Sequence, residues 1–133
     1  MRMPETKRQL QPVRVLIADD NPGARAGLKA LLKTLPVGPA GLEILEAADG
    51  QQAVSLAENR LPDLVLLDIQ MPMMDGITAL RQIKRRRPVT RVVVLTMFAD
   101  RRREALEAGA DLFLLKGAPP DRLLAAIQAT LSL

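Results

Sequence analysis

Short apolar runs that alternate with amphipathic segments constrain the fold of this chain more than any other feature. Five runs have the length and the branched residues of buried strands: residues 13–18, 42–47, 63–68, 91–96 and 111–116. Apolar residues recur at helical spacing between these runs, as Leu28, Leu31, Leu32 and Leu35 do after the first run. Because strands that alternate with helices form a parallel sheet covered on both faces, the sequence predicts one α/β domain with five strands and five helices.

Turn and capping residues mark where the helices begin and end. Asn21 and Asp75 precede helical patterns and are predicted to cap them, because a short polar side chain accepts a hydrogen bond from the first turn. The segment Pro119–Asp121 opens the last helix, since proline fits the first helical position. A helix over about residues 100–108 is predicted to end at Gly109, which tolerates the left-handed conformation beyond a helix end.

The residue types that the chain lacks exclude several kinds of site. It contains no Cys and no His, which excludes disulfides, thiolate nucleophiles, Cys- or His-ligated metals, histidine bases and histidine phosphocarriers. Asp, Glu, Lys and hydroxyl groups remain, and they favour hard-metal and phosphate chemistry. No apolar run approaches the roughly 18 residues of a membrane span. We expect a flexible polar tail over residues 1–12, a folded domain over 13–133, no membrane association and a cytoplasmic location.

The positive net charge of +4 is concentrated in two runs, Lys84–Arg87 and Arg101–Arg103. A solvated basic surface is the simpler interpretation, and a polyanion site is the alternative. Only two aromatic rings are available for base stacking, which disfavours binding of single-stranded nucleic acid. The first run lies at a helix end, where cations are favourable. The second lies in a first turn, where cations oppose the helix dipole, so we expect a partner or dimer contact there.

Polar residues follow four of the five predicted strands. Asp19 and Asp20 follow the first strand, Asp68 the third, Thr96 ends the fourth and Lys116 the fifth. Each alone has an ordinary explanation as a cap, a strand threonine or a solvated lysine. The carboxyl ends of parallel strands share one edge, however, and ligands bind there. Three carboxylates at one edge need a counter-charge, and Mg²⁺ or Mn²⁺ supplies it while allowing one carboxylate to act as a phosphoryl acceptor.

Several motifs resemble the receiver domain of bacterial two-component response regulators. The segments that carry the resemblance are Leu16–Asn21 (LIADDN), Glu46–Gly50 (EAADG), Asp68–Gly76 (DIQMPMMDG), Val94–Thr96 (VLT) and Leu114–Lys116 (LLK). The resemblance covers about residues 13–133. It implies a flavodoxin-like, doubly wound (βα)5 three-layer sandwich, with a five-stranded parallel sheet in the order 2-1-3-4-5. The LLK ending followed by Gly117 is more similar to regulators with a LuxR-type DNA-binding domain.

The resemblance also implies a role for each site residue. Asp68 corresponds to the phosphoacceptor, and Thr96 and Lys116 to the groups that sense the phosphate. The metal ligands are implied to be Asp19 (mainly through water), Asp20, Asp68 and the backbone carbonyl of Gln70. Phe113 corresponds to an aromatic switch that turns inward once Thr96 moves. It replaces the commoner Tyr, so that no hydroxyl contact is available.

A phosphoryl transfer from a sensor histidine kinase or phosphotransfer protein is the implied input. Contacts from Lys116 and Thr96 to the new phosphoryl group are worth about 1.5–3 kcal/mol each. Their sum is close to the roughly 5.5 kcal/mol that moves a two-state equilibrium from 1:99 to 99:1, provided that neither contact exists beforehand. The face formed by the fourth helix, fifth strand and fifth helix is implied to control a homodimer or an output domain. DNA contact is expected only through an output domain outside this sequence.

Two other functions remain open at this point. One is a receiver-like interaction module that is never phosphorylated. The other is an Mg²⁺-dependent phosphohydrolase with an aspartyl nucleophile, although an acid of its pattern is missing because Asp19 and Asp20 are adjacent and Gln70 follows Asp68 by two. We expect no enzyme activity beyond phosphotransfer and autodephosphorylation. Since the residue after Lys116 is Gly117 rather than proline, we also expect a trans peptide bond there.

Gln70 and Phe98 lie two residues beyond Asp68 and Thr96, where they are expected to tune hydrolysis of an acyl phosphate. The bulky Phe98 ring is predicted to shield the phosphate from water and to slow autodephosphorylation. Replacing Phe98 by Ala should therefore accelerate the loss of radioactive phosphate from the labelled protein. Rapid loss of label that is the same in the wild type and in F98A would contradict this prediction.

Overall fold

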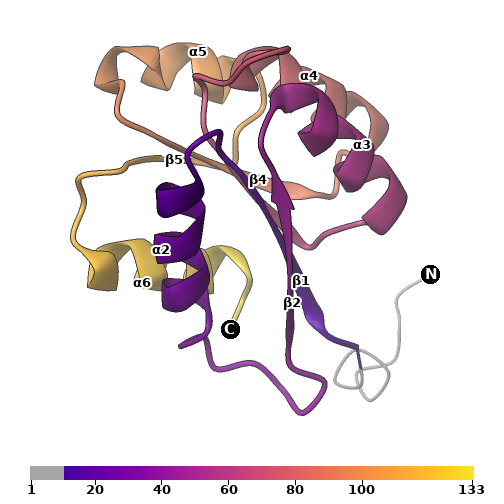
Figure 1. The fold of residues 1–133 in the computed structure, drawn as a ribbon, viewed down its shortest axis with the longest axis vertical. Coiled ribbons are helices and arrows are strands. Elements are labelled where there is room, and N and C mark those ends of the chain that lie inside the picture. The colour runs from indigo at the N-terminus through magenta and orange to yellow at the C-terminus, as the bar shows by residue number, and fades with distance from the viewer. Residues whose placement is uncertain (1–10) are drawn as a thin grey trace.

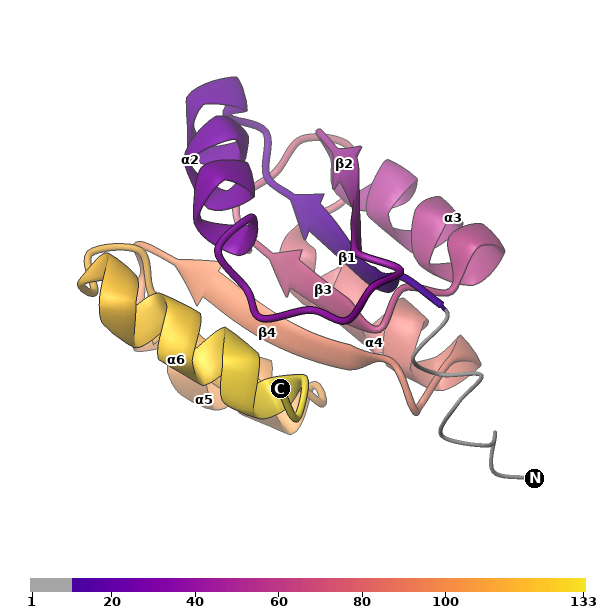
Figure 2. The same cartoon turned by 90° about the horizontal axis from the view of Figure 1, so that it is seen from below.

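A computed structural model describes residues 11–133 and shows a five-stranded parallel sheet between two layers of helices (Figures 1 and 2). The strands are β1 (Val13–Ala18), β2 (Leu42–Ala47), β3 (Leu64–Leu67), β4 (Arg91–Thr96) and β5 (Leu112–Leu115). Their order is β2-β1-β3-β4-β5, which confirms the predicted topology. Of the tail predicted over residues 1–12, residues 1–10 lie outside the described part of the chain.

The helices divide between the two faces of the sheet. They are α2 (Pro22–Leu32), α3 (Gly50–Arg60), α4 (Gly76–Arg86), the short 3-10 helix η1 (Ala99–Arg101), α5 (Arg102–Glu107) and α6 (Pro120–Thr130). Helices α2 and α6 cover one face, and α3, α4 and α5 cover the other (Figure 2). The five predicted helices correspond to α2 through α6. Across residues 11–133, none of them is both long and apolar enough to cross a membrane.

Side chains alternate between two cores because successive residues of a strand point to opposite faces. Val15 and Ile17 of β1 pack with α2 and α6, whereas Leu16 and Ala18 pack with α3, α4 and α5. Strand β3 is buried along its whole length, as expected for a central strand of a parallel sheet. The two cores hold the carboxyl ends of the strands in register at one edge.

The predicted caps are present. Asn21 Oδ1 accepts a hydrogen bond from the N–H of Ala24 at 3.1 Å, and Asp75 Oδ1 accepts one from Thr78 at 2.9 Å. Gly109 has a φ of +109°, in the region that favours glycine. No cis peptide bond occurs between residues 11 and 133, so the bond before Gly117 is trans as expected.

Two helix boundaries differ from the prediction. Helix α2 ends at Leu32, and Leu35 lies beyond it, although its side chain is still buried against the same core. Residue 35 precedes Pro36, and a residue before proline is disfavoured in the helical conformation. The helix expected over 100–108 begins as the 3-10 turn η1, and α5 itself has six residues.

Glycine is required where the loop after β3 turns into α4. The N–H of Gly76 donates to the carbonyl oxygen of Ile69 at 2.7 Å, and a Cβ at residue 76 would overlap the carbonyl oxygen of Asp68. This close approach holds the loop that follows Asp68 against the start of α4. The glycine therefore positions the residue predicted to react.

Replacing Gly76 by Ala should destabilise the domain by about 1–3 kcal/mol, because the backbone of Asp68 must move to admit the methyl group. Gly27 of α2 is the matched control, since nothing lies within 4 Å of a Cβ built there. G27A should raise the free energy of unfolding by up to about 1 kcal/mol through helix propensity. Urea unfolding measures both variants, and equal effects of G76A and G27A would contradict the packing argument.

Candidate functional site

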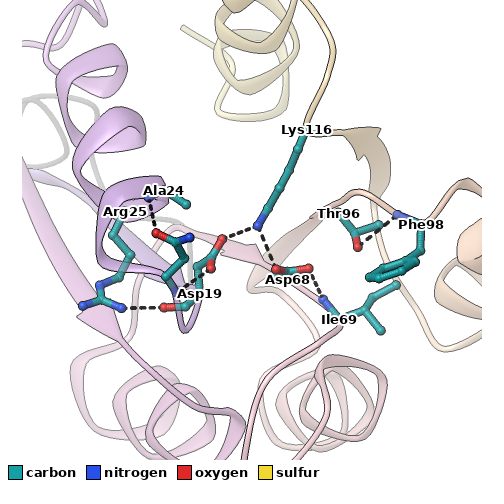
Figure 3. Close-up of polar contacts among 9 residues, drawn as sticks. Asp19, Ala24, Arg25, Asp68, Ile69, Thr96, Phe98 and Lys116 are labelled. Carbon is teal, nitrogen blue, oxygen red and sulfur yellow. Dashed lines mark hydrogen bonds and ion pairs between the residues drawn. The ribbon is translucent and has the colours of Figure 1, made fainter.

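Four strands deliver one polar side chain each to the same edge of the sheet (Figure 3). Asp19 follows β1, Asp68 follows β3, Thr96 ends β4 and Lys116 follows β5. The parallel ladder continues into these positions: the N–H of Asp68 donates to the carbonyl oxygen of Ala18 at 3.0 Å, and that of Lys116 to the carbonyl oxygen of Thr96 at 2.9 Å. The backbone therefore brings together residues that are far apart in the sequence.

The Lys116 ammonium lies between two buried carboxylates. Its Nζ is 2.6 Å from Oδ2 of Asp19 and 2.8 Å from Oδ2 of Asp68. Asp19 is 2% exposed and Asp68 8% exposed, so neither carboxylate is stabilised by bulk water. Lys116 is the counter-charge that both carboxylates contact.

The pKa of Lys116 reflects a competition between burial and these bonds. Burial alone lowers the pKa of an ammonium, but the hydrogen bonds and charges of Asp19 and Asp68 together outweigh it and raise the pKa above its ordinary value. Lys116 is therefore positively charged at neutral pH. The cluster carries a fixed cation beside the predicted reactive carboxylate.

Backbone N–H groups orient both carboxylates. Oδ1 of Asp68 accepts a hydrogen bond from the N–H of Ile69 at 2.7 Å, and Oδ1 of Asp19 accepts one from Asn21 at 2.9 Å. Each carboxylate therefore has one oxygen on the backbone and one on Lys116. Their positions are defined before any ligand binds.

Arg25 belongs to the site although the sequence pattern does not single it out. Its guanidinium donates to the carbonyl oxygen of Asp19 at 2.6 Å and pairs with Glu46 at 3.1 Å. Glu46 also pairs with Lys29 at 3.2 Å. Hydrogen bonding by Lys29 lowers the pKa of Glu46, against an opposing effect of burial, with Arg25 adding to the lowering. Only the fold shows that the first helix brings Arg25 to the end of β1.

The acidic residues have the donor set that a hard divalent cation prefers. Asp19, Asp20 and Asp68 each offer a carboxylate oxygen, and these oxygens lie within 4.8 Å of one another. Asp20 is exposed, so one side of the cluster is open to solvent. Gln70 is exposed in the loop after Asp68. The three carboxylates fit a magnesium ion; the ligand role of the Gln70 carbonyl stays a prediction.

Thr96 and Phe98 lie at the same edge of the sheet as the carboxylates (Figure 3), whereas Phe113 lies further back along β5. The Thr96 hydroxyl is fully buried and accepts a long hydrogen bond, 3.4 Å, from the N–H of Phe98. The Phe98 ring points toward Ile69 (Figure 3), and Phe98 is 39% exposed. Phe113 is 5% exposed on β5, where it is in register with Val94 of β4. The expected switch ring thus has a buried position in this structure.

The arginine run at the start of α5 has contacts within the domain. Arg101 and Arg103 pair with glutamates three and four residues further along, at 2.8 and 3.1 Å. The guanidinium carbon of Arg102 lies 6.0 Å from the centroid of the Phe113 ring. Arg101 and Arg103 therefore each have a glutamate partner within the domain, although such exposed pairs add little to stability. A partner or dimer contact at this run stays a prediction.

The other basic run, Lys84–Arg87 at the end of α4, also has contacts within the domain. Lys84 donates to the carbonyl oxygen of Thr90 at 2.6 Å and pairs with Asp111 at 2.7 Å. Arg86 pairs with Glu58 of α3. These bonds join α4 to the turn before β4 and to the neighbouring helix.

Sequence comparison places the chain near proteins of one family. Residues 15–128 match the sequence model of the response regulator receiver domain. The chain is 42% identical over 124 residues to the transcriptional regulatory protein PdtaR of Mycobacterium tuberculosis, covering 91% of this chain and 58% of that protein. It is 39% identical over 128 residues to a gliding motility regulatory protein of Myxococcus xanthus, covering 86% of this chain but 16% of that protein. The chain therefore spans between a sixth and about three fifths of these relatives.

Solved structures show the same architecture. A two-component response regulator of the LuxR family from Aurantimonas sp. SI85-9A1 has a TM-score of 0.81 at 31% identity, over 92% of this chain and 86% of that chain. A chain from the CheX–CheY–BeF3–Mg²⁺ complex of Borrelia burgdorferi has a TM-score of 0.79 at 31% identity, over 90% of this chain and 89% of that chain.

Replacing Lys116 by Met should leave two buried carboxylates without their cation. In the presence of EDTA we expect the free energy of unfolding to fall by about 1–3 kcal/mol, less than for a fully buried pair because Lys116 is partly exposed. Excess Mg²⁺ should restore most of this loss, since it supplies a cation to the same oxygens. The control is K33M, at an exposed lysine of α2's C-terminal end. A loss in K116M that Mg²⁺ does not reduce would contradict the counter-charge argument.

Proposed function

The chain belongs to the response regulator receiver domain family of two-component systems, and on this basis we propose that it is a phosphorylation-dependent switch. Asp68 accepts a phosphoryl group from a phosphohistidine on a sensor histidine kinase or phosphotransfer protein. The observation that carries the proposal is the placement of Asp68 between Lys116 and two further carboxylates at the open edge of the sheet.

The transfer exchanges one phosphorus bond for another. A carboxylate oxygen of Asp68 attacks phosphorus, the bond between phosphorus and the imidazole nitrogen of the donor breaks, and the imidazole leaves with the bonding electrons. Asp68 becomes an acyl phosphate. Lys116 is positioned to neutralise charge on the phosphoryl oxygens, because it already contacts Asp68.

Asp19, Asp20 and Asp68 are the residues that would hold Mg²⁺. When bound, the ion neutralises charge on the transferring phosphoryl oxygens. The solved CheY complex with BeF3 and Mg²⁺ supports this part of the proposal by similarity. The residues of this chain contribute oxygen ligands that are fixed by backbone N–H groups and by Lys116.

The existing contact of Lys116 changes the energetics that we expected from the sequence. The estimate of about 1.5–3 kcal/mol for each contact required that neither exist beforehand. Lys116 already binds the Asp68 carboxylate, so phosphorylation strengthens and redirects this bond instead of creating it. The larger new contribution is the hydrogen bond from the Thr96 hydroxyl, whose present partner, the N–H of Phe98, is 3.4 Å away.

A shift of Thr96 is expected to reach the face formed by α5, β5 and α6. Thr96 and Val94 lie on the same face of β4, and Phe113 is in register with Val94, so the ring adjoins the space that Thr96 leaves. This face then controls a homodimer or an output domain of a longer protein. The transcriptional regulators among the relatives favour an output that controls transcription in the cytoplasm.

Incubation with a small acyl-phosphate donor and Mg²⁺ tests this function directly. The intact mass of the wild type should increase by one phosphoryl group, and D68N should gain none. EDTA should abolish the gain. A wild type that gains no phosphoryl group would contradict the proposal and favour the phosphorylation-independent interaction module; equal gain in D68N would exclude Asp68 as the acceptor.

A further inference from the structure

Phe113 belongs to the core between the sheet and helices α4 and α5. It belongs to β5, which pairs with β4 only and forms one edge of the sheet. The helix nearest to its ring, α5, has six residues, of which Ala105 alone is buried. Nevertheless Phe113 is only 5% exposed. The core that it shares with Leu80 and Ile83 of α4 contributes to this burial.

The guanidinium of Arg102 is a further neighbour of the ring. Its guanidinium carbon is 6.0 Å from the ring centroid, at the limit of the range in which a cation is attracted to an aromatic face. Its neighbours Arg101 and Arg103 both pair with glutamates, whereas no ion pair joins Arg102 to a carboxylate within residues 11–133. Within the described residues the ring is therefore the one neighbour recorded for the charge of Arg102, whose side chain is otherwise exposed to solvent.

Arg102 also connects the ring to the reactive edge. Only five residues separate it from Thr96, and the intervening segment includes Phe98, whose N–H binds the Thr96 hydroxyl. When Thr96 turns toward a phosphoryl group, this bond must break and the segment that leads to Arg102 is free to shift. The same short segment thus carries a contact to each of the two switch residues.

We propose that Arg102 is a positioning residue that holds the Phe113 ring in its buried position and so sets the fraction of switched domains before phosphorylation. The proposal rests on the proposed function for the role of Phe113 as the switch. Loss of a cation–π contact at a partly exposed site changes a two-state population by about two- to fivefold, which is the expected size of the effect.

The aromatic composition makes the ring position measurable. The chain has two phenylalanines and no Trp or Tyr, so labelling with 4-fluorophenylalanine yields two ¹⁹F resonances. F98L assigns them. Line broadening by a soluble nitroxide then reports the solvent exposure of Phe113, with Phe98 as the internal reference, in the wild type, R102A, R102K and R103A.

We expect R102A to increase the exposed population of Phe113 about two- to fivefold and to leave the Phe98 resonance unchanged. R102K keeps the cation and should restore part of the burial. R103A is the matched control, because it removes an adjacent arginine with an ion pair but no ring contact, and it should behave as the wild type. Equal exposure of Phe113 in R102A and R103A would overturn the proposal, as would a general loss of structure that moves both resonances of R102A.

These measurements need no phosphodonor, so they remain decisive for the Arg102 contact if Asp68 is not phosphorylated. Addition of the acyl-phosphate donor and Mg²⁺ tests the link to the switch. Phosphorylated R102A should recover the buried ring of the wild type. If intact mass shows that R102A is phosphorylated while Phe113 stays exposed, the link between Arg102 and the switch is wrong although the phosphorylation itself is confirmed.

Discussion

The rest of the site depends on the contact between the Lys116 ammonium and the carboxylates of Asp19 and Asp68. It joins the ends of three strands, and its two bonds, 2.6 and 2.8 Å long, span 97 and 48 residues of sequence. Carboxylates in a buried site repel each other, and the Lys116 cation between them offsets this repulsion. The same cation prepares Asp68 for an incoming group with further negative charge.

The consequence for switching is an exchange of partners. Lys116 is already paired before any phosphoryl group binds, because its ammonium contacts the Asp68 carboxylate that would carry that group. We therefore expect the conformational change to break a weaker bond. The 3.4 Å hydrogen bond from the Phe98 N–H to the Thr96 hydroxyl is longer than the other hydrogen bonds named for the site, and hydrogen bonds weaken with length. We therefore expect Lys116 and its two carboxylates, which are joined by short bonds, to bind and orient the phosphoryl group. Thr96 and Phe98, which are joined by a long bond, are expected to move.

The fold and the positions of the reactive residues could be predicted from the sequence because both follow from local patterns. Short continuous apolar runs define the strands, helical spacing defines the helices, and a parallel sheet then brings the strand ends to one edge. Asp68 and Lys116 are found in this way without any knowledge of their contacts. The 2-1-3-4-5 order came from the family resemblance and is confirmed.

Contacts made by long side chains could not be predicted in the same way. Arg25 reaches the carbonyl oxygen of Asp19, and Arg102 comes within 6.0 Å of the centre of the Phe113 ring, through several rotatable bonds whose conformations depend on the packed structure. The bond between Lys116 and Asp68 before any ligand binds was not anticipated either, since strand order alone does not say where a flexible ammonium comes to rest. The six-residue length of α5 depended on a 3-10 turn that apolar spacing does not distinguish from an α-helix.

Side-chain NMR of the lysine ammonium groups tests the central claim most directly. The Nζ resonance of Lys116 is followed while the acyl-phosphate donor and Mg²⁺ are added, with Lys29, Lys33 and Lys84 as internal references. The account predicts a Lys116 ammonium that is hydrogen-bonded at the start and that shifts in step with phosphorylation, whereas the reference lysines do not shift. A Lys116 resonance that is solvent-exposed at the start, or that stays unchanged while Asp68 becomes phosphorylated, would contradict it.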